Sequence, residues 1–169
     1  MRWHGNWIKP WQVEGGRELR VYRSMNMSEK TLCDAGCRIL LVEDNSEHVF
    51  IALTVIRQIL GDTSEVIVAE TADEALELLS QFTEHDRPDL LLVDLRLPRN
   101  GGFSVLSAAR SYETLAHTPM FVITSSMYDR DIAQSYELGA SAVLCKPLSR
   151  ARLKEELARI GLSGGMLPL

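Results

Sequence analysis

The stretch that decides the fold is residues 88–102, PDLLLVDLRLPRNGG, in which four apolar residues run directly into a carboxylate, Asp94. An apolar run without alternation is typical of a strand that is buried on both faces of a parallel sheet. A lone buried charge is costly, so we expect Asp94 at the exposed end of this strand, next to a charged partner. Pro98 and Gly101-Gly102 then predict a sharp turn away from that end.

Five apolar runs of this kind alternate with segments of helical periodicity between residues 38 and 161. The expected strands are Ile39–Val42, Val66–Ala69, Leu90–Val93, Met120–Ile123 and Ser141–Leu144. The expected helical faces are carried by Val49–Leu60, Ala75–Phe82, Phe103–Ala109, Tyr128–Leu138 and Leu153–Ile160. Thr71 and Glu74 have the spacing of a capping box, and Gly139 is placed to end the fourth helix. This alternation predicts right-handed crossovers and an α/β fold with a doubly wound parallel sheet.

The composition is that of a globular domain, with 46% apolar and 24% charged residues among 169. No apolar run approaches the ~20 residues that cross a bilayer, and a signal peptide is missing, so we expect a cytoplasmic protein without membrane association. Residues 1–37 carry six Lys/Arg against four Asp/Glu, whereas residues 38–169 carry twelve against nineteen. This acidic balance argues against nucleic-acid binding. Cys33, Cys37 and Cys145 are too scattered for a zinc site, so we expect reduced thiols.

The first 37 residues differ in character from the rest. All three tryptophans lie here with four-residue spacing, at Trp3, Trp7 and Trp11. That spacing would line one face of a helix, but Gly5 and Pro10 disfavour a continuous helix. The expected organisation is a poorly ordered N-terminal extension over residues 1–37, one domain over residues 38–161 and a tail over residues 162–169.

Several polar side chains follow the expected strands at their carboxyl ends, which meet at one edge of a parallel sheet. They are Glu43, Asp44, Asp94, Thr124 and Lys146. Three clustered carboxylates repel one another, and a divalent cation relieves that repulsion. Oxygen ligands with room for water suit Mg²⁺. An ion of this kind and a lysine together would stabilise a phosphoryl group carried on a carboxylate.

These residues stand in four motifs that resemble the response regulator receiver family of two-component signalling. The motifs are Ile39–Asn45, Leu91–Pro98 with Gly101-Gly102, Phe121–Ser125 and Gly139–Pro147. The resemblance covers residues 38–161 and implies a flavodoxin-like (βα)5 fold with the strand order 2-1-3-4-5. Residues 135–140 also look like single-domain regulators that work with bacteriophytochrome-type kinases.

The resemblance implies that Asp94 accepts a phosphoryl group from a phosphohistidine of a sensor histidine kinase or a histidine phosphotransfer protein. It implies that Asp44, Asp94 and the backbone carbonyl of Arg96 hold Mg²⁺, with Glu43 acting indirectly. The chain would thereby catalyse its own modification without being a conventional enzyme. It would act as a stand-alone regulator through protein contact or as a homodimer, in both cases through helix four, strand five and helix five.

The resemblance also assigns Thr124, Ser125 and Lys146 to the phosphoryl group, with a cis bond between Lys146 and Pro147. Arg96 and Ser126 occupy the positions that flank the path of attacking water. Our hypothesis is that the long, cationic side chain of Arg96 shields the acyl phosphate or pairs with it.

The chain departs from the family at Val143, where a tyrosine or phenylalanine normally rotates inward on phosphorylation. A β-branched aliphatic side chain lacks that rotation, so a phosphorylation-independent binding module is the alternative function. A dehalogenase-type phosphatase would need an acid at the position of Arg96, and no glycine-rich nucleotide loop follows the first strand. We expect the four histidines on the surface, with His48 nearest to the acidic residues.

Overall fold

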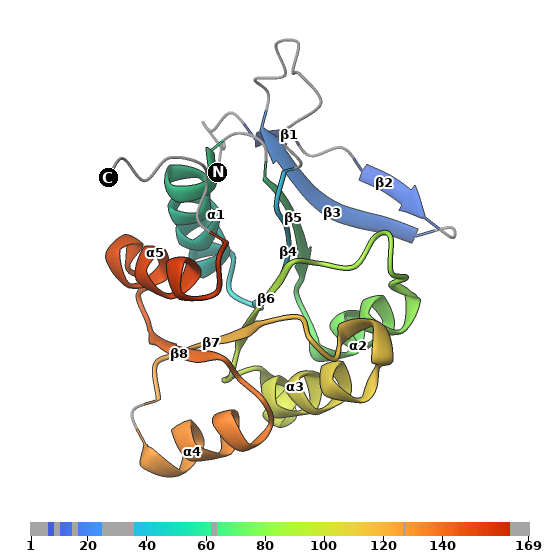
Figure 1. The fold of residues 1–169 in the computed structure, drawn as a ribbon. Coiled ribbons are helices and arrows are strands. Elements are labelled where there is room, and N and C mark those ends of the chain that lie inside the picture. The colour runs from blue at the N-terminus through green and yellow to red at the C-terminus, as the bar shows by residue number, and fades with distance from the viewer. Residues whose placement is uncertain are drawn as a thin grey trace.

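The computed structural model describes residues 7–8, 11–14, 17–24, 36–61, 64–126 and 128–162. Within these residues the chain forms one eight-stranded sheet in the order β1-β3-β5-β4-β6-β7-β8, and β2 pairs with β3 (Figure 1). The strands are β1 (Trp7–Ile8), β2 (Trp11–Glu14), β3 (Arg17–Ser24), β4 (Arg38–Val42), β5 (Glu65–Ala69), β6 (Leu90–Asp94), β7 (Met120–Thr124) and β8 (Ala142–Cys145). The helices are α1 (Ser46–Leu60), α2 (Ala72–Gln81), η2 (Pro98–Asn100), α3 (Gly101–Ser111), η3 (Glu113–Leu115), α4 (Asp129–Glu137) and α5 (Arg150–Arg159).

The five strands expected from the sequence form the parallel part of the sheet. Their spatial order β5-β4-β6-β7-β8 is the order 2-1-3-4-5, which confirms the flavodoxin-like topology. Each β6 residue is buried, as the unbroken apolar run predicts. Successive residues point to opposite faces: Leu40 and Val42 enter one apolar core, and Ile39 and Leu41 enter the other.

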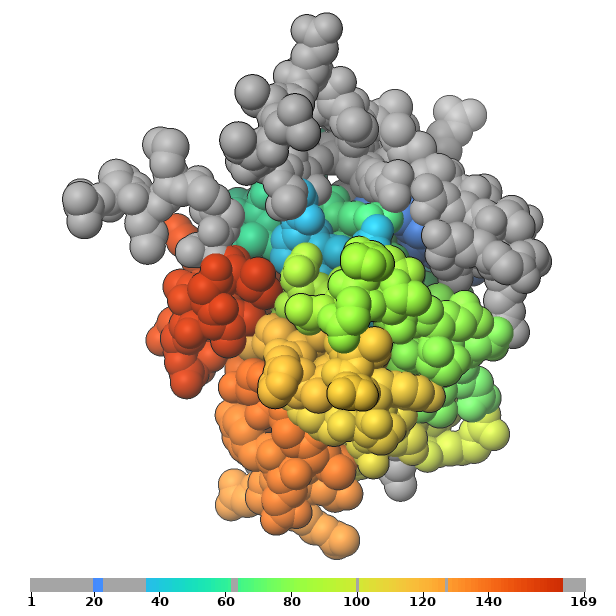
Figure 2. Space-filling model, turned by 45° about the vertical axis from the view of Figure 1, so that its right-hand side comes forward, coloured from blue at the N-terminus to red at the C-terminus, as the bar shows by residue number. Residues whose placement is uncertain are grey.

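Two helices cover each face of this parallel sheet. Helices α1 and α5 pack on one face and α2 and α3 on the other, whereas α4 lies beyond β7 and β8 (Figure 1). In the space-filling view the residues from α2 to α5 adjoin one another in a continuous surface (Figure 2). The topology thereby brings the carboxyl ends of β4, β6, β7 and β8 to one edge of the sheet.

Local sequence signals set the ends of the helices. Asn45 caps α1 and accepts hydrogen bonds from the first-turn amides of Glu47 and His48. Thr71 caps α2 through the amide of Glu74, at the expected capping-box spacing. The Glu74 carboxylate reaches back one residue further than the box requires, to the amide of Glu70.

Glycine at position 102 allows the turn after β6 to pass close to the strand end. A Cβ atom there would overlap the backbone oxygen of Asp94 and lie 2.7 Å from the Cα of Leu95. The start of α3 can therefore pack directly on the end of β6, where Asp94 is held.

The structure differs from the expected organisation at the N-terminus. β3 lies antiparallel to β5 with Val21 opposite Ile67, and the Val21 and Tyr22 side chains are buried. Arg20 forms an ion pair with Glu70, just after β5. The physical reason is that the edge of β5 offers unpaired backbone groups, which an extended segment can pair. β1 and β2 pair with β3 in turn, whereas residues 1–6, 9–10, 15–16, 25–35 and 163–169 lie outside the described part.

Over the described residues, every helix is too short or too polar to cross a bilayer.

Candidate functional site

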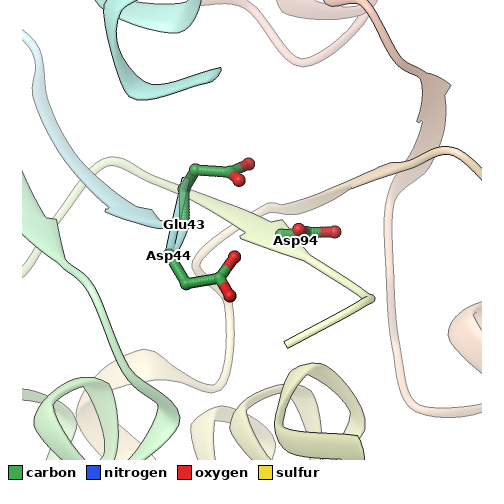
Figure 3. Close-up of side chains that lie close together, drawn as sticks. All are labelled: Glu43, Asp44 and Asp94. Carbon is green, nitrogen blue, oxygen red and sulfur yellow. The ribbon is translucent and has the colours of Figure 1, made fainter. Parts of the chain in front are cut away.

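Three carboxylates converge where β4 and β6 end. Figure 3 shows Glu43 and Asp44 following β4, and Asp94 at the end of β6, with their carboxyl groups turned into one space. One oxygen of each lies within 4.8 Å of the other two. Glu43 and Asp94 are 2% and 3% exposed, whereas Asp44 is exposed. The predicted convergence of these three residues is therefore present in the structure.

The partner that Asp94 requires is Lys146. Its Nζ lies 2.8 Å from Asp94 Oδ2 and 2.7 Å from Glu43 Oε2. The backbone amide of Lys146 donates to the carbonyl oxygen of Thr124, which extends the pairing of β7 with β8 as far as the lysine. The bond between Lys146 and Pro147 is cis, as predicted.

His48 completes the surroundings of the ammonium group. Its Nδ1 lies 3.0 Å from Lys146 Nζ and 3.0 Å from Glu43 Oε1. Asp94 and Glu43 each accept from this ammonium group, and the tautomer of His48 determines whether its Nδ1 accepts from Lys146 or donates to Glu43 Oε1. His48 was expected on the surface and nearest to the acidic residues; its contact with Lys146 was not predicted. The position of His48 three residues after the Asn45 cap indicates a side chain near the helix end and Glu43, but gives no signal for Lys146.

Thr124 and Ser126 form the neighbouring wall of the site. Thr124 is buried at the end of β7, and its Oγ1 accepts a hydrogen bond of 2.9 Å from the amide of Ser126. The hydroxyl proton of Thr124 is therefore not used in that bond. Ser125 is exposed between them.

Arg96 contributes to the site through its backbone, while its side chain turns elsewhere. The amide of Arg96 donates to Asp94 Oδ1 at 2.9 Å. Its guanidinium group contacts Ser126 Oγ at 2.9 Å and Asp131 Oδ2 at 3.1 Å. Arg96 and Ser126, the two positions expected to flank the path of attacking water, contact each other, and Asp131 is a third member of this cluster that was not predicted.

Val143, in β8, lines a hollow of about 450 Å³ next to the site. The lining also includes Thr124, Ile132, Tyr136 and Pro147. Val143 is half-buried and packs against the core on the α2–α3 face. A valine leaves space in this hollow that a larger side chain would fill.

The donor set suits a hard divalent cation. Carboxylate oxygens are the ligands that Mg²⁺ prefers, and the exposure of Asp44 leaves room for the waters that this ion retains. Within the described residues, the cluster of Glu43, Asp44 and Asp94 contains no thiol or imidazole ligand, the groups that favour zinc. Cys37 and Cys145 are free thiols, and Cys33 lies outside the described part.

This arrangement can be compared with known proteins. The response regulator receiver domain model matches residues 39–158. The chain belongs to the response regulator receiver family. Receiver domains are generally not catalytic, and they generally interact with histidine kinases or phosphotransfer proteins.

Individual receiver proteins are similar to this chain in sequence and in structure. The probable methanogenesis regulatory protein FilR2 of Methanothrix harundinacea is 35% identical over 124 residues, which cover 72% of this chain and 79% of that protein. The structure of the phosphorylated cyanobacterial phytochrome response regulator RcpA is 30% identical, with a TM-score of 0.63, and the match covers 80% of this chain and 100% of that chain. The receiver domain of a Pseudomonas aeruginosa sensor histidine kinase, solved with a magnesium ion in its active site cleft, is also 30% identical, with a TM-score of 0.63 and coverage of 74% and 97%.

Proposed function

We propose that this chain is a receiver that accepts a phosphoryl group on Asp94 from a phosphohistidine of a sensor histidine kinase or a phosphotransfer protein. The observation that carries the proposal is the Lys146 ammonium group, which lies within 2.8 Å of both Asp94 and Glu43. A fixed cation beside clustered carboxylates can stabilise the negative charge that a phosphoryl group brings.

Among the three carboxylates, Asp94 is the best placed acceptor. β6, which carries it, lies between β4 and β7, and these strands lead to the other site residues. Its two oxygens are oriented by the amide of Arg96 and by Lys146. Glu43 is more enclosed, because both of its oxygens have partners. Lys146 contacts Oε2, and His48 and the amide of Asn45 contact Oε1.

In the proposed reaction, an oxygen of Asp94 forms a bond to phosphorus while the bond from phosphorus to the donor histidine nitrogen breaks. The electron pair of the broken bond returns to the imidazole, which takes up a proton from solvent. Lys146 neutralises part of the added charge. Thr124 can donate its hydroxyl proton to a phosphoryl oxygen while it still accepts from Ser126, and the small side chain of Ser125 leaves access open.

Asp44, Asp94 and the carbonyl of Arg96 would hold Mg²⁺, and Glu43 would act indirectly, through its contact with Lys146. When bound, the ion supplies positive charge to the phosphoryl oxygens. The protein's own contribution is to hold these oxygen ligands together on two adjacent strands.

The proposed output is a protein contact that depends on phosphorylation. It would involve α4, β8 and α5, which adjoin the Thr124–Lys146 side of the site, and a homodimer through this face is part of the proposal. The similarity to a phytochrome response regulator supports a sensor kinase of that kind as the donor.

A second candidate function is a binding module that works without phosphorylation. Val143 favours it, because valine lacks the large side chain that would move between buried and exposed positions. The retained contacts of Lys146 with Asp94 and Glu43 favour phosphorylation instead.

The experiment is intact-mass measurement after incubation with acetyl phosphate and Mg²⁺. We expect the wild type to gain one phosphoryl group and Asp94→Asn to gain none. Asp73→Asn, an exposed carboxylate on α2, is the matched control and should be modified like the wild type. An unmodified wild type, or an adduct that persists in Asp94→Asn, would refute the proposal, and the former result would favour the binding module.

A further inference from the structure

A charged cluster lies next to the three carboxylates and links the loop after β6 to α4. The Arg96 guanidinium group bridges Ser126 Oγ and Asp131 Oδ2, and Ser126 Oγ donates to the same Asp131 oxygen at 2.6 Å. Ser126 is buried, and Asp131 lies in the first turn of α4. α4 is the orange helix at the bottom of Figure 1, the next helix after β7.

Backbone hydrogen bonds connect this cluster to the proposed phosphorylation site at two points. The amide of Arg96 donates to Asp94, and the amide of Ser126 donates to the Thr124 hydroxyl. The backbone of Arg96 therefore contacts the proposed acceptor, whereas the charge of its side chain is neutralised by Asp131 on α4.

We infer that Asp131 is a positioning residue that holds the Arg96 guanidinium group away from Asp94 and thereby shortens the lifetime of the aspartyl phosphate. This inference rests on the proposed function of Asp94. It revises the simple expectation that Arg96 shields the phosphoryl group, because in the structure its charge is already engaged by Asp131.

Asp131 and a phosphoryl group on Asp94 would compete for the Arg96 guanidinium group. The Arg96 side chain is 51% exposed, and ion pairs of such exposure are individually weak. A phosphoryl group carries roughly 1.5 to 2 negative charges, against one on Asp131. Once Asp94 is phosphorylated, the Arg96 guanidinium group is therefore bound to Asp131 and Ser126 in only a fraction of the molecules. In the others it contacts the phosphoryl group.

The position of the guanidinium group decides how fast water can reach phosphorus. Hydrolysis forms a bond from a water oxygen to phosphorus and breaks the bond to the Asp94 oxygen, which releases inorganic phosphate and restores the carboxylate. Water must approach in line with the bond that breaks, from the side of phosphorus opposite Asp94. A guanidinium group released from Asp131 can bind the outer phosphoryl oxygens and occupy that approach.

The test is a double-mutant cycle on the half-life of the phosphorylated protein. After acetyl phosphate is removed, the loss of the adduct is followed by intact mass for the wild type, Asp131→Asn, Arg96→Met and the double variant. We expect Asp131→Asn to lengthen the half-life about fivefold, or about 1 kcal/mol in activation free energy. In the Arg96→Met background the same substitution should have no effect.

Asp129→Asn is the matched control, because it removes an equal charge from the same turn of α4. It should leave the half-life unchanged, and circular dichroism should show all variants folded. An unchanged or shorter half-life in Asp131→Asn, equal lengthening in Asp129→Asn, or lengthening that survives without Arg96 would each overturn the inference. A wild type that takes up no phosphoryl group would remove the proposed function as well, so the two failures are distinguishable.

Discussion

Replacing Lys146 by methionine removes the only cation that the described structure places between Glu43 and Asp94. Both carboxylates are nearly inaccessible to solvent, at 2% and 3% exposure, so water cannot take the place of the ammonium group. We expect Lys146→Met to destabilise the fold strongly when no divalent cation is present, because removing one partner leaves buried charge uncompensated.

The structure allows the size of this effect to be worked out. At distances of 2.7 and 2.8 Å and an effective dielectric constant of about 20, each attraction is about 6 kcal/mol. The free-energy costs of burying the charged groups offset most of this combined attraction, so the free energy of unfolding should fall by about 3–5 kcal/mol, as is typical when one partner of a buried ion pair is removed. In an Asp94→Asn background one of the two carboxylates is gone, and the loss should be roughly half as large.

Urea denaturation in a chelating buffer measures these differences, with Lys154→Met on the exposed side of α5 as the control. The control should change stability by less than about 0.5 kcal/mol. Added Mg²⁺ should recover part of the stability of Lys146→Met, because a dication can compensate the same carboxylates. If Lys146→Met behaved like the control, or lost as much stability without Asp94 as with it, the electrostatic account of the site would be wrong.

Three further predictions concern the scaffold. Gly102→Ala forces a methyl group against the backbone of Asp94, so we expect a loss of about 2 kcal/mol or more in urea denaturation, and an unchanged midpoint would contradict this. The Arg110 guanidinium group donates to carbonyl oxygens at the end of η3, in the loop from η3 to β7 and after α4. Arg110→Met should therefore cost about 3 kcal/mol by the same assay, and a cost below about 1 kcal/mol would count against that role. Burial, and secondly the charge of Asp89, raises the pKa of the Cys37 thiol to about 12. Alkylation at pH 8 should therefore label the exposed Cys145 well before Cys37, and the labelling of Cys37 should become faster as the pH rises. Equal labelling of the two cysteines in a peptide map would refute this.

The periodicity of the chain was sufficient to predict its core. β6 could be read from LLLV followed by Asp94 because burial on both faces leaves an unbroken apolar run. The cap at Thr71 and the helix stop at Gly139 are local interactions, and they lie at the positions where the sequence indicates them, whereas the cap at Asn45 was not predicted. The convergence of Asp44 with Asp94 followed from a topological rule, since parallel strands present their carboxyl ends at one edge.

The N-terminal strand shows how a local pattern can be insufficient. Residues 17–24 lack the strong apolar run of a buried strand, and their neighbours in sequence suggested poor order. A Gly-Gly pair at residues 15–16, between β2 and β3, was the available hairpin signal. What decides the position of β3 is the open edge of β5, which is remote in sequence.

The sequence by itself determined the alternation of strands and helices and the edge at which the carboxylates and Lys146 gather, because these depend on the periodicity of burial and on the parallel arrangement of the strands, whereas the strand order was expected from the resemblance to the receiver family. Only the tertiary structure decided that the ring of His48 reaches Lys146, 98 residues away, and that the charge of Arg96 is held by Asp131, 35 residues away. The reason is physical: a side chain several bonds long can satisfy its charge with any partner within reach. Which partner lies within reach is set by how the loops and helices pack around the sheet, and no local pattern of residues records it.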